Sequence, residues 1–114
     1  MATQSFKDLI VWQRGRDLTV EIYKSFQNCR DFSFKDQVQR AALSIPNNIA
    51  EGYARRSDKA FKNFLYIARG SAAEVESMLH IAPELRYIST ASQRELTDKT
   101  HEIMKLLNAF IKKL

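Results

Sequence analysis

Four residues between positions 59 and 69 have the types and the spacing of a phosphate-binding surface. Lys59, Lys62, Tyr66 and Arg69 follow one another at intervals of three, four and three residues, which places them on one face of a helix. Ammonium and guanidinium groups bind phosphate oxygens, and a tyrosine between them can stack on an exposed base. The alternative is that Tyr66 packs against a neighbouring helix while the lysines are only solvated. The spacing leaves both interpretations open.

Positive charge is concentrated around this group of residues. The chain of 114 residues has 18 Lys and Arg against 13 Asp and Glu, a net charge of +5 and a pI near 9.5. Residues 55–69 contain five basic side chains, Arg55 and Arg56 among them, against the single acidic Asp58. A local basic patch on a mixed surface predicts a polyanionic partner such as RNA or DNA. Plain solvation of charges near a helix–helix turn is the alternative.

Other side chains that could do chemistry are few. Two histidines, His80 and His101, and the single Cys29 are too few for a zinc site within one chain. A di-iron site would need two Glu-x-x-His motifs facing the core, and neither Glu76-x-x-x-His80 nor Asp98-x-x-His101 lies on an apolar seam. There is no glycine-rich phosphate loop and no supported Ser–His–Asp arrangement. We therefore expect no enzyme activity, no metal and no cofactor.

The elements that must position these residues are all helices. Apolar residues recur at helical spacing in four segments, and no segment has the alternation of a strand. The predicted helices span about residues 8–28, 34–54, 58–87 and 93–113. With short connections, they can bury their faces as an up-down-up-down antiparallel four-helix bundle, one domain over residues 1–114.

Start signals support three of these helices. Ser33-x-x-Asp36 and Ser92-x-x-Glu95 resemble capping boxes, and Ser57 is suited to cap the helix that carries the basic residues. Pro46 and Pro83 each remove one hydrogen bond from a predicted helix. Whether they kink or break their helices is left open.

Composition places few further limits on the protein. With 45% hydrophobic residues, the chain is large enough to bury a core without a disulfide or a metal. No segment approaches the roughly 20 apolar residues of a membrane span, and no signal peptide is recognisable. Cys29 is expected to be a buried thiol in a reducing compartment. We expect a cytoplasmic protein.

An unusual set of polar residues lies in the two central helices. If these helices form a hairpin that turns near residues 56 and 57, the numbers of facing residues add up to about 113. This register predicts a partly buried ion pair between Arg40 and Glu74, which would fix the hairpin. Small residues at positions 70 and 71 would allow close approach of the helices. The expected structural polar network comprises Arg40, Ser44, Asn48, Glu51, Ser71 and Glu74.

The apolar arc of the third predicted helix is wider than a single bundle core needs. Ile67, Met78 and Leu85 extend it beyond the main seam. A helix that is apolar over so much of its circumference is buried on two sides. We therefore expect these three residues to contribute to an interface between subunits.

Several segments together resemble a known family. They are DLIVWQ at 8–13, QRAA at 39–42, SIPNNIAEG at 44–52, ARGS at 68–71, and Glu74. Over about residues 6–114 the chain is similar to the four-helix-bundle proteins encoded within intervening sequences of bacterial 23S ribosomal RNA. More distantly it resembles the accessory variability determinant of diversity-generating retroelements. Gly15, where the family usually has Ala, and Pro83 and Arg86 depart from the family pattern.

The resemblance implies an assembly and a general role. It implies a small bundle that forms a ring, usually a homopentamer, in a bacterial protein associated with nucleic acid. Our leading hypothesis is a non-enzymatic homo-oligomer that binds RNA or DNA with low sequence specificity through Arg55, Arg56, Lys59, Lys62, Tyr66 and Arg69. The alternative is a protein–protein scaffold or accessory subunit whose positive charge is incidental.

Overall fold

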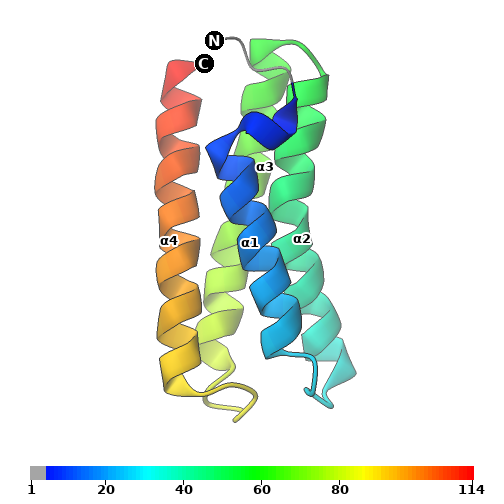
Figure 1. The fold of residues 1–114 in the computed structure, drawn as a ribbon, viewed down its shortest axis with the longest axis vertical. Coiled ribbons are helices and arrows are strands. Elements are labelled where there is room, and N and C mark those ends of the chain that lie inside the picture. Colours follow the sequence, from blue (N-terminus) through cyan, green and yellow to red (C-terminus); the bar gives the residue numbers. More distant parts are fainter. Residues whose placement is uncertain (1–4) are drawn as a thin grey trace.

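Four helices make up most of residues 5–114, the part of the chain that the computed structural model describes. After a short 3-10 turn, η1 (Phe6–Asp8), they are α1 (Ile10–Ser25), α2 (Phe32–Ala54), α3 (Asp58–Ile81) and α4 (Thr90–Lys113). Successive helices run in opposite directions (Figure 1). Residues 5–114 contain no strand, so the prediction of an all-α fold with four helices is confirmed.

The helices form a bundle that is about twice as long as it is wide, 44 × 21 × 21 Å. α2 packs against α1 and α3, and α4 closes the bundle by packing against the same two helices. The α2–α3 turn lies at the same end as the chain termini, and the other two connections lie at the opposite end (Figure 1).

The core is built from one apolar stripe on each helix. The predicted stripes are confirmed by side chains that are almost fully buried: Leu18, Ile22, Ile45, Ile49, Leu65, Leu79, Ile103 and Leu107. Burying a side chain of this size stabilises a fold by about 1.5–3 kcal/mol. Phe26 is also fully buried, while Cys29 is half-buried beside the core and not inside it as predicted.

Two helices begin earlier than predicted because other residues cap them. The Asp31 carboxylate accepts a hydrogen bond from the backbone N–H of Phe34 at 3.1 Å, so α2 begins at residue 32 and Ser33 lies inside its first turn. In the same way Ser89 caps α4, accepting from the backbone N–H of Ser92 at 3.0 Å. Each cap satisfies an N–H group that the helix itself leaves unpaired.

α3 begins as predicted but ends six residues earlier. The Ser57 hydroxyl accepts a hydrogen bond from the backbone N–H of Ala60 at 3.3 Å, which confirms the predicted cap. The helix ends at Ile81 because Pro83 cannot continue it, and Arg86, with a φ of 62°, turns the chain into the next connection. Pro83 therefore ends its helix, and the predicted extension to residue 87 is wrong.

Pro46, by contrast, lies inside α2 without ending it. Proline has no N–H to donate to the carbonyl four residues earlier, which belongs to Ala42. The buried Thr19 hydroxyl of α1 lies 3.1 Å from that carbonyl oxygen and supplies a donor. A Cβ atom on Gly15 would lie 3.4 Å from the Pro46 ring, so the glycine brings α1 close to the proline.

The two connections at the far end of the bundle are joined by a hydrogen bond. The Tyr87 hydroxyl donates to the Asp31 carboxylate at 2.5 Å, and the Tyr87 ring packs edge-on against Phe34. This hydrogen bond raises the pKa of Tyr87 to about 12 and holds the pKa of Asp31 below its usual value. The hydrogen bond thus joins the connection between α1 and α2 to the connection between α3 and α4. α1 itself ends at Ser25, and not near residue 28 as predicted.

α2 and α3 pack tightly against each other at Gly52. A Cβ atom at this position would lie 2.7 Å from the Phe64 Cβ and 2.9 Å from the Phe61 Cδ1. These distances are shorter than van der Waals contact, so only glycine fits. Gly70, which we expected to serve the same purpose, is exposed and has no atom within 4 Å of an added Cβ.

The two glycines therefore predict opposite effects of the same substitution. Gly52→Ala should lower the free energy of unfolding by about 1–3 kcal/mol, because the new methyl group displaces Phe61 or Phe64. Gly70→Ala is the matched control and should raise it by up to about 1 kcal/mol, because alanine favours a helix interior. Urea unfolding at one protein concentration measures both. A Gly52→Ala variant at least as stable as the unsubstituted protein would contradict the packing described here.

Candidate nucleic-acid interface

The predicted basic stripe lies on the flank of α3 that faces α4. Its position is fixed by Arg69, whose Nη1 donates a hydrogen bond to the Asn108 Oδ1 of α4 at 2.9 Å. Lys59 is exposed, Lys62 is half-buried, and Tyr66 is 44% exposed. The helical spacing thus keeps four of the six predicted residues on one flank of α3, and Arg69 joins that flank to α4.

Arg69 is more constrained than a free surface cation. Besides its bond to Asn108, its guanidinium lies over the Tyr66 ring, 4.8 Å from the ring centre. A cation in this position is attracted to the electron-rich face of the ring. Arg69 therefore holds one face of Tyr66, while the ring as a whole stays partly open to solvent.

Arg55 and Arg56 do not join the stripe. Arg55 donates to the Glu51 carboxylate of its own helix at 3.0 Å, and its guanidinium lies 5.2 Å from the centre of the Phe64 ring. Arg56 occupies the α2–α3 turn with a φ of 57°. Arg55 is thus paired, and Arg56 extends the positive charge only around the end of the bundle.

α4 contributes two cations that we did not predict. Lys105 and Lys112 are exposed, and they lie three residues before and four residues after Asn108. Residues at these intervals neighbour Asn108 on the helix surface, so both lysines are exposed beside the residue that contacts Arg69. The spacing was visible in the sequence, but the face of α4 that meets α3 was not.

Together these residues form one continuous feature, which we call the α3–α4 basic surface. It consists of Lys59, Lys62, Tyr66 and Arg69 of α3 and Lys105, Asn108 and Lys112 of α4. Asp58 lies at its start in the first turn of α3. Farther along α3 the charge changes sign at Glu76.

Glu76 connects α3 to α4 through two histidines. Its carboxylate oxygen is 2.7 Å from His101 Nε2 of α4 and 3.6 Å from His80 Nε2 of its own helix. The hydrogen bond with His101 lowers the pKa of Glu76 despite the opposing effect of partial burial. Both histidines remain about half exposed, and no three residues among positions 5–114 form a group that could hold a metal ion.

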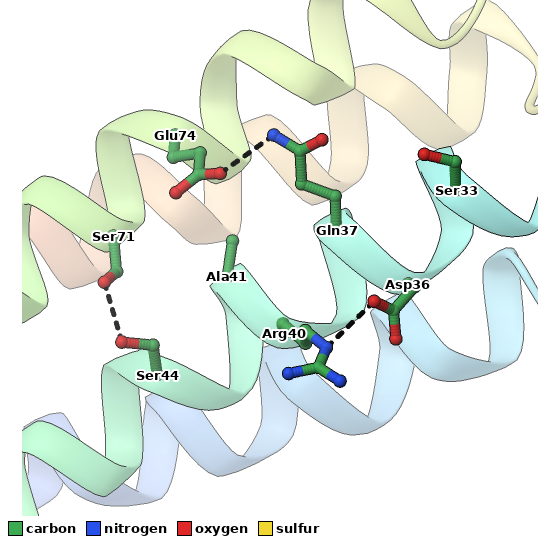
Figure 2. A pocket seen from close by; sticks show the side chains of 8 residues that line it. All are labelled: Ser33, Asp36, Gln37, Arg40, Ala41, Ser44, Ser71 and Glu74. Atoms are coloured by element: carbon green, nitrogen blue, oxygen red, sulfur yellow. Dashed lines mark hydrogen bonds and ion pairs between the residues drawn. The ribbon is translucent and has the colours of Figure 1, made fainter.

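Part of the predicted polar network is present between α2 and α3. The Ser44 and Ser71 hydroxyls are 2.9 Å apart across the two helices (Figure 2). Asn48 donates to the Ser44 hydroxyl at 2.8 Å. These partly buried groups satisfy one another, which a close contact between two helices requires. Glu51, predicted to face Lys62, instead forms the pair with Arg55 described above.

The predicted ion pair between Arg40 and Glu74 is wrong. Arg40 pairs with Asp36, one turn earlier on its own helix, at 2.8 Å, and its side chain is 79% exposed. Glu74 accepts a hydrogen bond from Gln37 at 3.2 Å. Figure 2 shows both pairs at the open pocket between α2 and α3, with Arg40 directed away from Glu74. The pair with Asp36 leaves the Arg40 charge in solvent, whereas the predicted pair with Glu74 required partial burial of both charges.

The three predicted interface residues have different environments. Ile67 is 52% exposed on α3 and is available to a partner. Met78 is only 6% exposed and packs in the core of its own chain, so its assignment to a second surface is wrong. Leu85 is exposed, but it lies in the connection after α3 and does not extend a helical stripe.

Glu76 predicts how stability depends on pH. Because its folded pKa lies below the unfolded value near 4.5, ionised Glu76 stabilises the fold above that pH, and the contribution is lost as pH falls through the folded pKa. Glu76→Gln should therefore be less stable than the unsubstituted protein near neutral pH, by at most about 1 kcal/mol. The difference should shrink in acid.

Unfolding curves measured from neutral pH to strong acid test this expectation. Glu84→Gln, at an exposed glutamate in the connection after α3, removes the same charge and serves as the control. A Glu76→Gln difference that grows as pH falls would contradict the assigned role of the carboxylate.

No helix among residues 5–114 is both long and apolar enough to span a bilayer. The described surface is instead that of a bundle with charged flanks and a few exposed apolar side chains.

Comparison with known proteins identifies the family of the chain. The model of the 23S rRNA-intervening sequence protein family matches residues 7–109. The chain is also similar to a solved structure from Bacteroides thetaiotaomicron VPI-5482, a protein of unknown function from the S23 ribosomal protein family. The TM-score is 0.84 and the identity is 30%, over 90% of this chain and 99% of that one. A comparison with curated proteins found no match. With the family model covering nearly all of its four helices, the chain belongs to the 23S rRNA-intervening sequence protein family.

Proposed function

We propose that this protein is a non-enzymatic homo-oligomer that binds the phosphate backbone of RNA or DNA through the α3–α4 basic surface. The observation that carries the proposal is that α4 continues the stripe of α3. Lys105 and Lys112 lie on either side of Asn108, which holds Arg69. Cations from two adjacent helices thus lie near one contact between α3 and α4.

The chemistry of the surface favours the backbone over the bases. Lysine ammonium groups on flexible, exposed side chains contact phosphate oxygens without distinguishing sequence. We therefore expect affinity that depends strongly on salt and weakly on sequence.

The family and the solved relative agree with this proposal without deciding it. The family is described by its link to 23S rRNA, and the Bacteroides thetaiotaomicron protein is assigned to a ribosomal protein family of unknown function. Neither description is that of an enzyme family.

We further propose that the chain assembles with itself, as a ring of five in line with its resemblance. Support comes from apolar side chains left open to solvent on three helices: Val20 (46%), Tyr23 (40%), Leu43 (39%) and Ile67 (52%). A cyclic assembly repeats the same surface around one axis. Each copy would then add its own α3–α4 basic surface, which strengthens binding to a long polyanion.

Salt dependence tests the binding proposal. Replacing Lys59, Lys62 and Lys112 together with glutamine should weaken binding to a mixed oligonucleotide. The slope of log affinity against log salt concentration should become less steep by about 2, because up to three phosphate contacts are lost.

The matched control removes the same charge elsewhere. Lys24, Arg30 and Arg86 are exposed and lie outside the α3–α4 basic surface. Replacing these three residues with glutamine should preserve most of the affinity for the oligonucleotide and the slope of log affinity against log salt concentration. Equal losses in the two triple variants would mean that only net charge matters, and salt-insensitive binding would refute the proposal.

Light scattering after size exclusion tests the assembly. The unsubstituted protein should elute as a closed oligomer, and Ile67→Glu should shift it toward smaller species because a charge would be buried at the interface. The control is Ile81→Glu, at an isoleucine of similar exposure near the end of α3, and it should not change the size of the oligomer. A strict monomer at micromolar concentration would contradict the assembly.

The second candidate function is a protein–protein scaffold. The exposed side chains of Val20, Tyr23 and Leu43 favour it, because they form apolar surface away from the basic residues. In that case the lysine variants would bind their partner normally, and substitutions among these three residues would abolish binding.

A further inference from the structure

Tyr66 differs from the other exposed aromatic side chains of the described chain. Tyr23, Phe32 and Tyr66 are 40%, 73% and 44% exposed. Among residues 5–114, only Tyr66 of these three has a cation over its ring, the guanidinium of Arg69 at 4.8 Å. The rings of Trp12 and Phe64 also carry an arginine, but both side chains are half-buried.

The cation over Tyr66 is itself held in place. Arg69 donates to Asn108 on α4 at 2.9 Å, so the arginine is fixed by the neighbouring helix and not only by the ring. The ring is thus held on one face and partly open to solvent. A side chain already fixed in this way loses little conformational freedom when a ligand packs on it, which favours binding.

The surroundings of the ring supply charge at the distance of a nucleotide's own phosphates. Lys62 lies four residues before Tyr66, about 6 Å along the helix axis. Lys105 and Lys112 lie on α4 on either side of Asn108, the residue that contacts Arg69. A ligand that stacks on the ring therefore has cations of both helices in its neighbourhood.

The geometry points to Tyr66 as a stacking platform for one unpaired base, and hence to single-stranded nucleic acid as the preferred ligand. This inference rests on the proposed function. Bases within a duplex are already stacked and paired, so a ring lying against a helix flank reaches only a base that is turned out of the stack. Phosphate contacts alone would not favour the single strand, because a duplex carries phosphate charge at the higher density.

Binding of matched single-stranded and double-stranded oligonucleotides tests the inference. An oligonucleotide of about 12 nucleotides, a typical size for grooves that use aromatic stacking, is used alone and annealed, in RNA and DNA forms. The variants are Tyr66→Phe, Tyr66→Leu, Tyr66→Ala and, as a control at another exposed aromatic residue, Phe32→Ala. Circular dichroism establishes that each variant is folded.

We expect the unsubstituted protein to bind the single strand more tightly than the duplex. Tyr66→Ala and Tyr66→Leu should weaken single-strand binding about 5- to 100-fold, while the salt slope and duplex binding stay the same. Tyr66→Phe keeps the ring and should bind within about twofold of the unsubstituted protein. Phe32→Ala should change nothing.

Two results would overturn the inference and leave the phosphate-binding proposal intact. One is equal, salt-dependent binding of the two strand forms, and the other is single-strand binding that survives Tyr66→Ala and Tyr66→Leu. Failure to bind any oligonucleotide in a salt-dependent way would overturn the proposed function and this inference together.

Discussion

The close contact between Gly52 of α2 and the phenylalanines of α3 sets the geometry of the whole bundle. The space beside the Gly52 Cα holds a hydrogen atom but not a methyl group. This contact therefore fixes how α2 and α3 lie against each other beside their turn. The Ser44–Ser71 hydrogen bond, farther from the turn, is consistent with the same alignment of the two helices. Once this hairpin is aligned, the inward and outward faces of α3 are determined over its whole length.

The basic surface follows from that alignment. α3 buries one stripe in the core and packs a second flank against α2, so the residues that remain lie toward α4 or toward solvent. Lys59, Lys62, Tyr66 and Arg69 occupy the α4 side, and Asn108 meets Arg69 there. The α3–α4 basic surface thus lies between the start of α3 and Glu76. Beyond it, Glu76 and its histidine partners hold α3 to α4.

Much of this arrangement could be predicted from the sequence, because core stripes and helix faces depend on spacing alone. The same spacing placed Ser44 opposite Ser71 to within two residues. The Arg40–Glu74 pair could not be predicted this way, because a long exposed side chain takes its nearest partner, here Asp36. The contribution of Lys105 and Lys112 was missed because the connection from residue 82 to 89 hides the register between α3 and α4.

In the proposed function, nucleic acid lies along the α3–α4 basic surface. Photo-crosslinking of a bound oligonucleotide followed by mass spectrometry locates the contact without altering the protein. Crosslinks should fall within residues 59–69 of α3 and 105–112 of α4, with Tyr66 among them. Crosslinks confined to α1 and the outer face of α2 would contradict the account.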